Sequence, residues 1–226
     1  MNQRKKQMQL VVKEKQNSLV QKDQWLNELT WQFLRRDVNE EFTIDISIKE
    51  FDKDQHNLIN DNLSLCTSLI KFTLIIRDIQ SIKEEDKSNF LLHIGECLKN
   101  CYHLQYMDIQ LQTRIDKYQV EQFIHTTTQF ENITKYILTL RSLYLDLNNL
   151  QNIGTSFKNF KKLNNFQTRI WSDDLNHEGV SRLYSQISNI KSIKKLTIDL
   201  QYFNLKQLFN LPNLFLIQYL SLRPSD

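Results

Sequence analysis

The chain has 226 residues, of which 40% are apolar and 24% are charged, and its formal net charge is +3. This balance is typical of globular proteins and excludes a wholly disordered chain. With only three glycines and two prolines, collagen-like and Pro/Gly-rich low-complexity proteins are excluded as well. The apolar fraction contains no alanine and comes mainly from Leu, Ile and Phe, so the sequence predicts a core of large side chains.

The positive charge is concentrated at the N-terminus. Residues 1–40 contain eight Lys or Arg and five Asp or Glu, whereas the remainder contains 21 of each. The balanced body argues against a domain-wide surface for DNA. We expect a basic N-terminal arm over residues 1–40, with a frayed polar helix or disorder over 1–17. An amphipathic helix follows between residues 18 and 36, where apolar side chains recur at helical spacing: Trp25, Leu26, Leu29 and Phe33. We interpret it as a cap for a repeat array; a partner-binding helix is the alternative.

Cysteine usage and hydropathy predict an intracellular protein. An odd set of three cysteines does not form a disulfide framework and indicates a reducing compartment, cytoplasmic or nuclear: Cys66, Cys97 and Cys101. No apolar stretch is long enough to span a membrane, and the first twenty residues lack the apolar segment of a secretory signal. We therefore expect no membrane association.

An alternating apolar pattern recurs along the chain. Each copy starts with a Leu or Ile, and from the third residue after it every second residue is apolar, with the single exception of Thr168. This alternation is typical of a strand with one buried face. The copies begin at Leu69, Leu104, Leu140, Leu163, Ile193 and Ile217, and an earlier copy without the leading residue begins at Phe42. The third of these, Leu140-x-x-Leu143-x-Leu145-x-Leu147, predicts a strand over residues 143–147.

Apolar residues also recur three, six and ten positions ahead of each leading residue. This spacing is helical, so each strand is expected to follow an amphipathic helix. The column three positions ahead contains Cys66, Cys101, Ile137, Phe160, Ile190 and Leu214. Because a strand always follows a helix, successive strands must be parallel, with the helices along one side. The sequence predicts a curved α/β solenoid of about seven repeats over residues 41–226, with one strand per repeat and helices on the convex side.

This pattern resembles the leucine-rich-repeat superfamily, in particular its helix-containing, ribonuclease-inhibitor-like type. The segment Leu143-Tyr144-Leu145-Asp146-Leu147-Asn148 with Ile153-Gly154 is similar to the protist-type variant L-x-L-D-L-x-x-N-x-I-G. The resemblance covers residues 42–222 and implies a leucine-rich-repeat solenoid. The buried asparagine of the family recurs only at Asn148 among its five expected positions, so we expect an irregular horseshoe or a short arc.

Side chains between the buried strand positions should line the concave face of such a solenoid. We predict that a protein partner binds there, because a polar surface with scattered aromatic groups suits a protein better than a small molecule. The predicted binding residues are Tyr106, Asp108, Gln110, Tyr144, Asp146, Arg169, Trp171, Asp199 and Tyr219. The chain is then a non-catalytic interaction module or scaffold subunit, with no small-molecule substrate and no cofactor.

Lysines recur near the helix-to-strand junctions: Lys158, Lys161, Lys162, Lys191, Lys194 and Lys195. The simplest interpretation is that they complement helix dipoles and stay solvated. The alternative is an edge that binds RNA or an acidic peptide. With the basic N-terminal arm, this edge supports an alternative function as an RNA-associated or ribonucleoprotein subunit.

Two side-chain clusters were weighed as chemical sites. A zinc site at Cys97 and Cys101 with His93 and His103 is disfavoured, because Cys101 occupies an apolar column and no further Cys-x-x-Cys pair exists. Acidic residues ahead of a helix are ordinarily N-caps, so we prefer capping to hydrolysis for the second cluster: Asp173, Asp174, His177 and Glu178. No phosphate-binding loop, kinase signature or nucleophile elbow is present, and we predict neither a catalytic site nor a metal.

Overall fold

The computed structural model describes residues 8–12, 40–46, 53–77, 84–113, 115–141, 145–171, 177–201 and 217–223. They contain one eight-stranded sheet whose strands lie side by side in sequence order, and every neighbouring pair is parallel. The strands are β1 (Met8–Val12), β2 (Glu41–Ile46), β3 (Lys71–Arg77), β4 (Tyr106–Gln112), β5 (Lys135–Arg141), β6 (Asn165–Trp171), β7 (Lys195–Gln201) and β8 (Ile217–Arg223).

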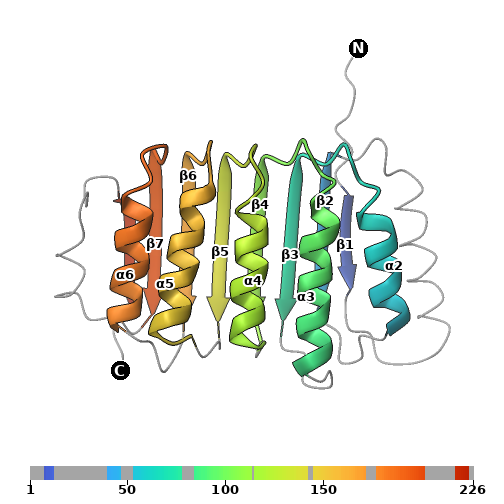
Figure 1. Ribbon diagram of the computed structural model, residues 1–226, viewed down its shortest axis with the longest axis horizontal. Helices are drawn as coiled ribbons and strands as arrows, with labels where there is room; N and C mark the ends of the chain where they lie inside the picture. The colour runs from blue at the N-terminus through green and yellow to red at the C-terminus, as the bar shows by residue number, and fades with distance from the viewer. Residues whose placement is uncertain are drawn as a thin grey trace, which may run out of the picture.

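Helices precede the strands along the chain and lie on a single face of the sheet (Figure 1). They are α2 (Lys53–Leu63), α3 (Glu84–Leu98), α4 (Lys117–Thr127), α5 (Leu147–Ser156) with the short 3-10 helix η2 (Phe157–Asn159), and α6 (His177–Ser188). The predicted parallel α/β repeat architecture with helices along one side is therefore confirmed. The row of helices in Figure 1 is wider than the row of strands that it covers. No helix among the described residues is both long and apolar enough to cross a membrane.

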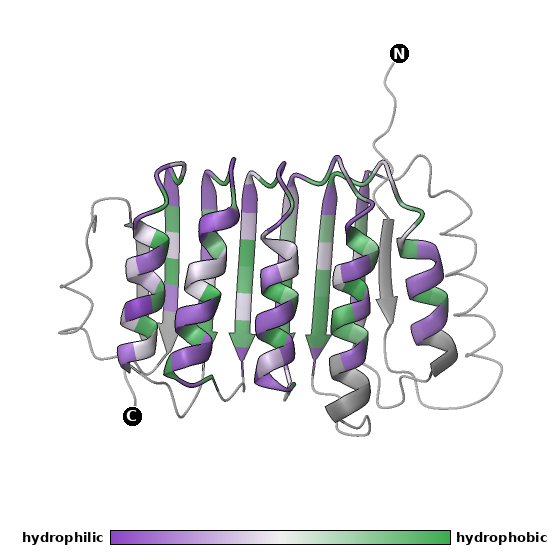
Figure 2. Cartoon of the chain, in the orientation of Figure 1, coloured by the Kyte–Doolittle hydropathy of each residue, from purple (hydrophilic) through white to green (hydrophobic). Residues whose placement is uncertain are grey.

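The core lies between the sheet and the helices. In strands β2–β7 every second side chain points toward the helices. Figure 2 shows hydrophobic and hydrophilic residues alternating along β7. One buried position aligns across six strands and is at most 2% exposed in each: Phe42, Phe72, Met107, Tyr136, Phe166 and Leu196. Burying one such side chain contributes about 1.5–3 kcal/mol, so the stacked units stabilise one another.

One strand differs from its predicted position. We predicted a strand over residues 143–147, but the strand is β5 at 135–141, and residue 147 already begins helix α5. The segment Ile133-x-x-Tyr136-x-Leu138-x-Leu140 obeys the same pattern, so two overlapping matches share Leu140. With β5 in place, the aligned positions 42, 72, 107, 136, 166 and 196 are separated by 30, 35, 29, 30 and 30 residues. The shift also removes Ile137 from the helix column, and Phe130 takes its place.

The two ends of the sheet also differ from expectation. Within the predicted N-terminal arm, residues Met8–Val12 form a strand that pairs with β2. At the other end, the repeat pattern predicts that Leu220 of β8 pairs with Leu196 of β7. In the structure Leu220 pairs with Ile198, two residues further along β7, and the register is irregular between Leu196 and Thr197. The predicted capping helix at residues 18–36 and the column member Leu214 lie outside the described residues.

All three glycines of the chain lie where neighbouring helices approach closely. A Cβ on Gly154 of α5 would stand 3.1 Å from Leu183 Cα of α6, and a Cβ on Gly179 would stand 3.2 Å from Leu147 Cα. On Gly95 of α3 it would stand 3.2 Å from a ring carbon of Phe123 of α4. Glycine is therefore explained at these positions by helix packing between units, which needs no loop function.

Candidate functional site

The sheet face opposite the helices carries the candidate site, and we call it the open face. The strand register aligns its side chains in three rows across β2–β7, and none of the described helices covers them (Figure 1). The rows are Glu41, Lys71, Tyr106, Lys135, Asn165 and Lys195; Thr43, Thr73, Asp108, Ile137, Gln167 and Thr197; and Asp45, Ile75, Gln110, Thr139, Arg169 and Asp199. Four further side chains extend it near the strand ends: Arg77, Gln112, Arg141 and Trp171.

Acidic groups on β2 are paired with bases on β3. Arg77 donates to Asp45 Oδ2 at 3.0 Å, and Lys71 lies 3.4 Å from Glu41 Oε2. Burial raises the pKa of Asp45 above its ordinary value, and the Arg77 guanidinium opposes that shift. The charge on this part of the open face is therefore neutralised by its own side chains.

Two aromatic rings on the open face contact cations. The ammonium groups of Lys71 and Lys135 lie 5.1 and 4.7 Å from the centre of the Tyr106 ring, and Arg141 lies 5.8 Å from the centre of the Trp171 ring. Such contacts favour the cation over the ring face by electrostatic attraction to the π-system. Burial, with Asp108 and Glu41 nearby, raises the pKa of Tyr106 to about 12, so this phenol stays protonated.

Asp108 lies in the middle of the open face. Burial raises its pKa above the ordinary value, while a hydrogen bond from Gln110 (3.3 Å) and the charges of Arg169, Lys135 and Lys71 oppose the shift. Gln112 in turn donates to Gln110 Oε1 at 3.3 Å. The centre of the face is therefore a hydrogen-bonded polar strip along β4.

Four polar atoms on the open face are buried without a hydrogen-bond partner among the described residues: Asp45 Oδ1, Thr139 Oγ1, Asp199 Oδ1 and Trp171 Nε1. Arg169 Nε approaches the other oxygen of Asp199 only to 3.9 Å. Buried polar groups in native proteins are nearly always paired, and leaving one unpaired costs about 1–3 kcal/mol. The open face of the free protein therefore carries a free-energy cost at these four atoms.

Most of the predicted binding residues meet on this face. The structure brings together Tyr106, Asp108, Gln110, Arg169, Trp171 and Asp199. Tyr219 lies on β8, at the register position beside Thr197 of β7. Tyr144 lies outside the described residues.

The prediction for Asp146 is wrong, because the strand in its unit ends at Arg141. Asp146 is instead the N-cap of α5 and accepts hydrogen bonds from the backbone N–H groups of Asn148 and Asn149. Lys117 donates to its other carboxylate oxygen at 2.6 Å. The matching Asp116, thirty residues earlier, caps α4 in the same way. The repeated pair Ile115-Asp116 and Leu145-Asp146 is the sequence signal that indicates the correct register. With that register, Lys135, Thr139 and Arg141, which the prediction missed, are assigned to the open face.

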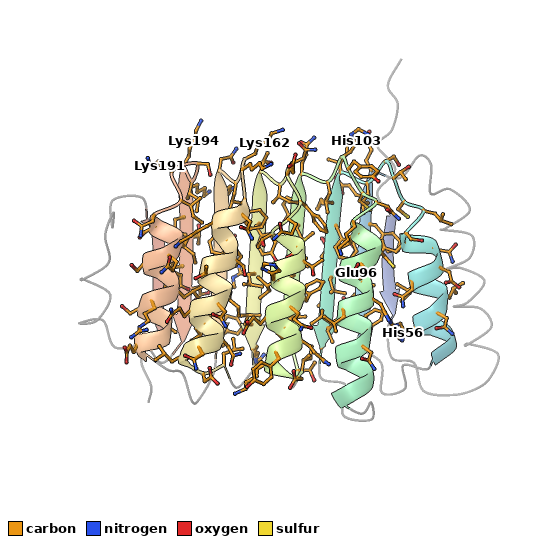
Figure 3. All side chains as sticks on the ribbon, viewed as in Figure 1. His56, Glu96, His103, Lys162, Lys191 and Lys194 are labelled. Carbon is orange, nitrogen blue, oxygen red and sulfur yellow. The ribbon has the colours of Figure 1, made fainter. Side chains whose placement is uncertain are left out.

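The predicted lysines lie at the helix-to-strand junctions. Lys158 is in η2, Lys195 is the first residue of β7, and the other four lie in the connecting segments. We call these six side chains the lysine edge: Lys158, Lys161, Lys162, Lys191, Lys194 and Lys195. Figure 3 shows Lys162, Lys191 and Lys194 along the edge where the strands begin. Here one backbone carbonyl accepts two successive N–H groups of the next unit, as Asn164 O does from Lys194 and Lys195 (2.8 and 2.9 Å). The backbone that carries the lysines is therefore held in register with the sheet.

The lysines of this edge are exposed, and two of them have partners one unit away. Lys161 forms an ion pair with Glu131, and Lys162 donates to Asn132 Oδ1 at 2.7 Å. No acidic group within salt-bridge distance is recorded for Lys158, Lys191, Lys194 or Lys195 in the described part of the chain. The lysines are thus gathered on one edge, as the repeat predicted.

The cysteine and histidine side chains considered for zinc do not converge into a ligand set among the described residues. Cys101 is buried and donates to Cys66 O at 3.2 Å, while Cys97 donates to Asn60 O at 3.3 Å. Burial raises the pKa of Cys101 to about 12, which keeps it a neutral thiol. Sequence reasoning missed the contact of His93 Nδ1 with His56 Nε2 at 3.1 Å. No group of three metal-ligating side chains occurs within the described ranges.

The acidic cluster ahead of α6 is described only in part. Asp173 and Asp174 lie outside the described residues, and His177 is the first residue of α6. Glu178 accepts a hydrogen bond from Arg182 at 2.6 Å one turn later, an ordinary i, i+4 pair.

Comparisons of the chain with protein-family models, with curated proteins and with solved structures found no match. Its function must therefore be argued from the geometry of the open face and the lysine edge.

Proposed function

We propose that the chain is a non-catalytic, leucine-rich-repeat-type interaction module that binds another protein across the open face. The observation that carries this proposal is a sheet face that no described helix covers, on which aligned rows of polar side chains surround the rings of Tyr106 and Trp171. Aromatic anchors among polar groups are typical of protein interfaces. A polypeptide offers both the N–H groups and the carbonyl groups that such a mixed set of donors and acceptors requires.

The shape expected of this architecture supports the same function. Neighbouring strands lie about 4.7–4.9 Å apart, whereas packed helices need about 8–10 Å between their axes. With one helix and one strand in each unit, the sheet must bend so that the open face is on the inside, and the wider row of helices in Figure 1 agrees with this. Concave surfaces of stacked repeats are extended binding surfaces.

The size of the open face favours a macromolecule over a small ligand. Its rows cross six strands from β2 to β7, a width of about 24 Å at the usual strand spacing. Small-molecule sites are instead closed pockets that enclose most of the ligand. The aromatic anchors Tyr106 and Trp171 stand on β4 and β6, so a partner that touches both must extend across β5.

The test compares two triple variants. Gln110, Arg169 and Trp171 are replaced together by Ala on the open face, and Gln122, Arg182 and Tyr118 are replaced by Ala on the solvent side of the helices as the matched control. Partners captured by the wild-type chain are identified, and the affinity of each purified partner is then measured for both variants. Loss of binding of at least about tenfold, or 1.4 kcal/mol, is expected for the open-face variant alone.

Circular dichroism and thermal unfolding of both variants show whether the fold is intact. If the folded open-face variant binds every partner as the wild type does, the proposed function is wrong. Equal losses in both variants would contradict it too, because the binding would then not be located on the open face.

A further inference from the structure

The charge of the surface changes along the solenoid. The β5–β7 part of the open face and the lysine edge together carry nine basic residues: Lys135, Arg141, Lys158, Lys161, Lys162, Arg169, Lys191, Lys194 and Lys195. The described residues of this surface include two acidic ones, Glu131 and Asp199. The β2–β4 part of the open face instead has Glu41, Asp45 and Asp108 against Lys71 and Arg77. The chain as a whole carries only +3, so this is a local accumulation of positive charge.

Little of this charge is neutralised by the chain itself. Glu131 pairs with Lys161, and Asp199 lies 3.9 Å from Arg169. For the other seven basic groups the described residues provide no carboxylate within salt-bridge distance. Their mutual repulsion is a cost in the free protein, and it attracts an anionic partner.

We propose that the protein partner binds this surface, which we call the basic surface, through an acidic polypeptide segment. This inference rests on the proposed function and names the chemistry of the partner. Its carboxylates would lie along the lysine edge, and its backbone would reach the neighbouring strands β5–β7 of the open face. The lysine edge and these strands are continuous, because Lys195 belongs both to the edge and to the first row of the open face.

Polar groups within the basic surface favour a peptide over RNA. Asp199 Oδ1 needs a hydrogen-bond donor, and Trp171 Nε1 needs an acceptor. A peptide backbone supplies N–H and C=O groups at regular spacing. The phosphates of RNA present only acceptors. Its donors, the 2′-hydroxyls and the base edges, come with one phosphate per nucleotide, and the Asp199 carboxylate repels that charge. The same lysines attract either polyanion, but the groups beside them fit a polypeptide.

The test uses the full chain and a fluorescently labelled poly-L-glutamate peptide, with labelled poly-uridine RNA as the competing probe. Binding of poly-L-glutamate that weakens as salt increases is expected. The edge variant replaces Lys158, Lys191 and Lys194 by Gln, and we expect at least about tenfold weaker binding, since three charge contacts are lost. The matched control replaces Lys99, Lys117 and Arg182 by Gln, which removes the same charge elsewhere, and it should bind within about twofold of the wild type.

A further variant examines the contribution of the open face. Trp171→Phe keeps an aromatic ring but removes the N–H donor, and we expect several-fold weaker binding of poly-L-glutamate with an unchanged salt dependence. If the Lys→Gln variant binds poly-L-glutamate more weakly but Trp171→Phe binds it as the wild type does, the peptide backbone does not lie over β6, and that part of the inference is overturned.

Three results overturn the inference. They are absence of poly-L-glutamate binding at low salt, equal weakening in the edge variant and its control, and preferred binding of poly-uridine RNA through the same lysines. None of them touches the proposed function if purified partners still lose affinity for the Gln110/Arg169/Trp171 variant. Conversely, partners that bind this variant normally contradict the proposed function, whatever poly-L-glutamate does.

Discussion

The two faces of one sheet follow different rules in this protein. Toward the helices, the aligned positions in β2–β7 are apolar except at Thr168, and those whose burial is described are nearly inaccessible. On the open face, one row of the same strands contains Glu, Lys, Tyr, Lys, Asn and Lys in succession. The repeat therefore exists on one face only. The helix-covered face specifies the fold, and the open face is free to specify a partner.

Replacing Tyr136 by Ala should have the largest effect on stability. Its ring packs between Phe157, Phe160 and Phe166 under the helices, and its hydroxyl lies 3.0 Å from Thr127 Oγ1. Loss of about 3–5 kcal/mol in the free energy of unfolding is expected, measured by urea denaturation. The control is Thr139→Val on the open face of the same strand. Its hydroxyl is buried without a hydrogen-bond partner among the described residues, so the free energy of unfolding should not fall and should rise by about 1–3 kcal/mol at most. Similar losses for both variants would contradict the difference between the faces.

Gly179→Ala should cost about 1–3 kcal/mol, because the new methyl group would meet Leu147 Cα and the Leu150 side chain of α5. Gly95→Ala is the milder counterpart, since its nearest neighbours are side-chain atoms of Phe123 and Thr126. Thermal unfolding of both variants measures the difference. If Gly179→Ala leaves the unfolding temperature unchanged, α5 and α6 do not approach as closely as described here.

Asp146→Ala separates capping from binding. Removing the N-cap of α5 should cost about 1 kcal/mol, with unchanged affinity for a partner of the open face. The hydrogen bond from Lys117 lowers the pKa of Asp146, as do the backbone N–H groups of α5. Its stabilising contribution is therefore complete above the unfolded pKa of about 3.9 and is lost as the pH falls through the lower folded value. Lost binding with unchanged stability would restore the register in which Asp146 lies on a strand.

Asp108→Asn should have the smallest effect and the opposite sign. Burial raises the pKa of Asp108, so its charged form is penalised in the folded protein at neutral pH. The Asn variant is expected to be slightly more stable at pH 7, and this advantage should vanish as the pH falls below the folded pKa, because the wild-type carboxyl is then protonated. Denaturant titrations across this pH range check the sign. A variant less stable at pH 7 would show that the attraction of Arg169, Lys135 and Lys71 exceeds the cost of burial.

Much of the helix-covered face could be predicted from the sequence. The leading residues Leu69, Leu104, Leu163 and Ile193 and the thiols of Cys66 and Cys101 are buried as their columns indicated. The unit at β5 was misplaced because Ile133 and Leu140 each start an acceptable pattern. Local alternation cannot choose between them; hydrogen bonding to β4 and β6 selects the copy that keeps the units about thirty residues apart.

The open face was predictable only where the strand register was correct. Gln110 and Arg169 were placed properly, whereas Thr139, which lies between them, was missed together with Lys135 and Arg141. Arg141 against Trp171, and Lys71 with Lys135 around Tyr106, are contacts between different strands. Their sequence separation follows the unit length, so an error in one unit displaces every neighbour in its row.

By itself the sequence determined the order of helix and strand, and hence the parallel sheet with one covered face, because apolar periodicity is a local property of each segment. The tertiary structure decided the rest. It determined which of two overlapping patterns becomes β5, which cations lack an acidic neighbour among the described residues, and which buried atoms lack a hydrogen bond there. These depend on what the adjacent unit places beside each strand. A shift of one residue would turn every side chain of a strand to the other face, so only pairing in three dimensions defines the surface that a partner meets.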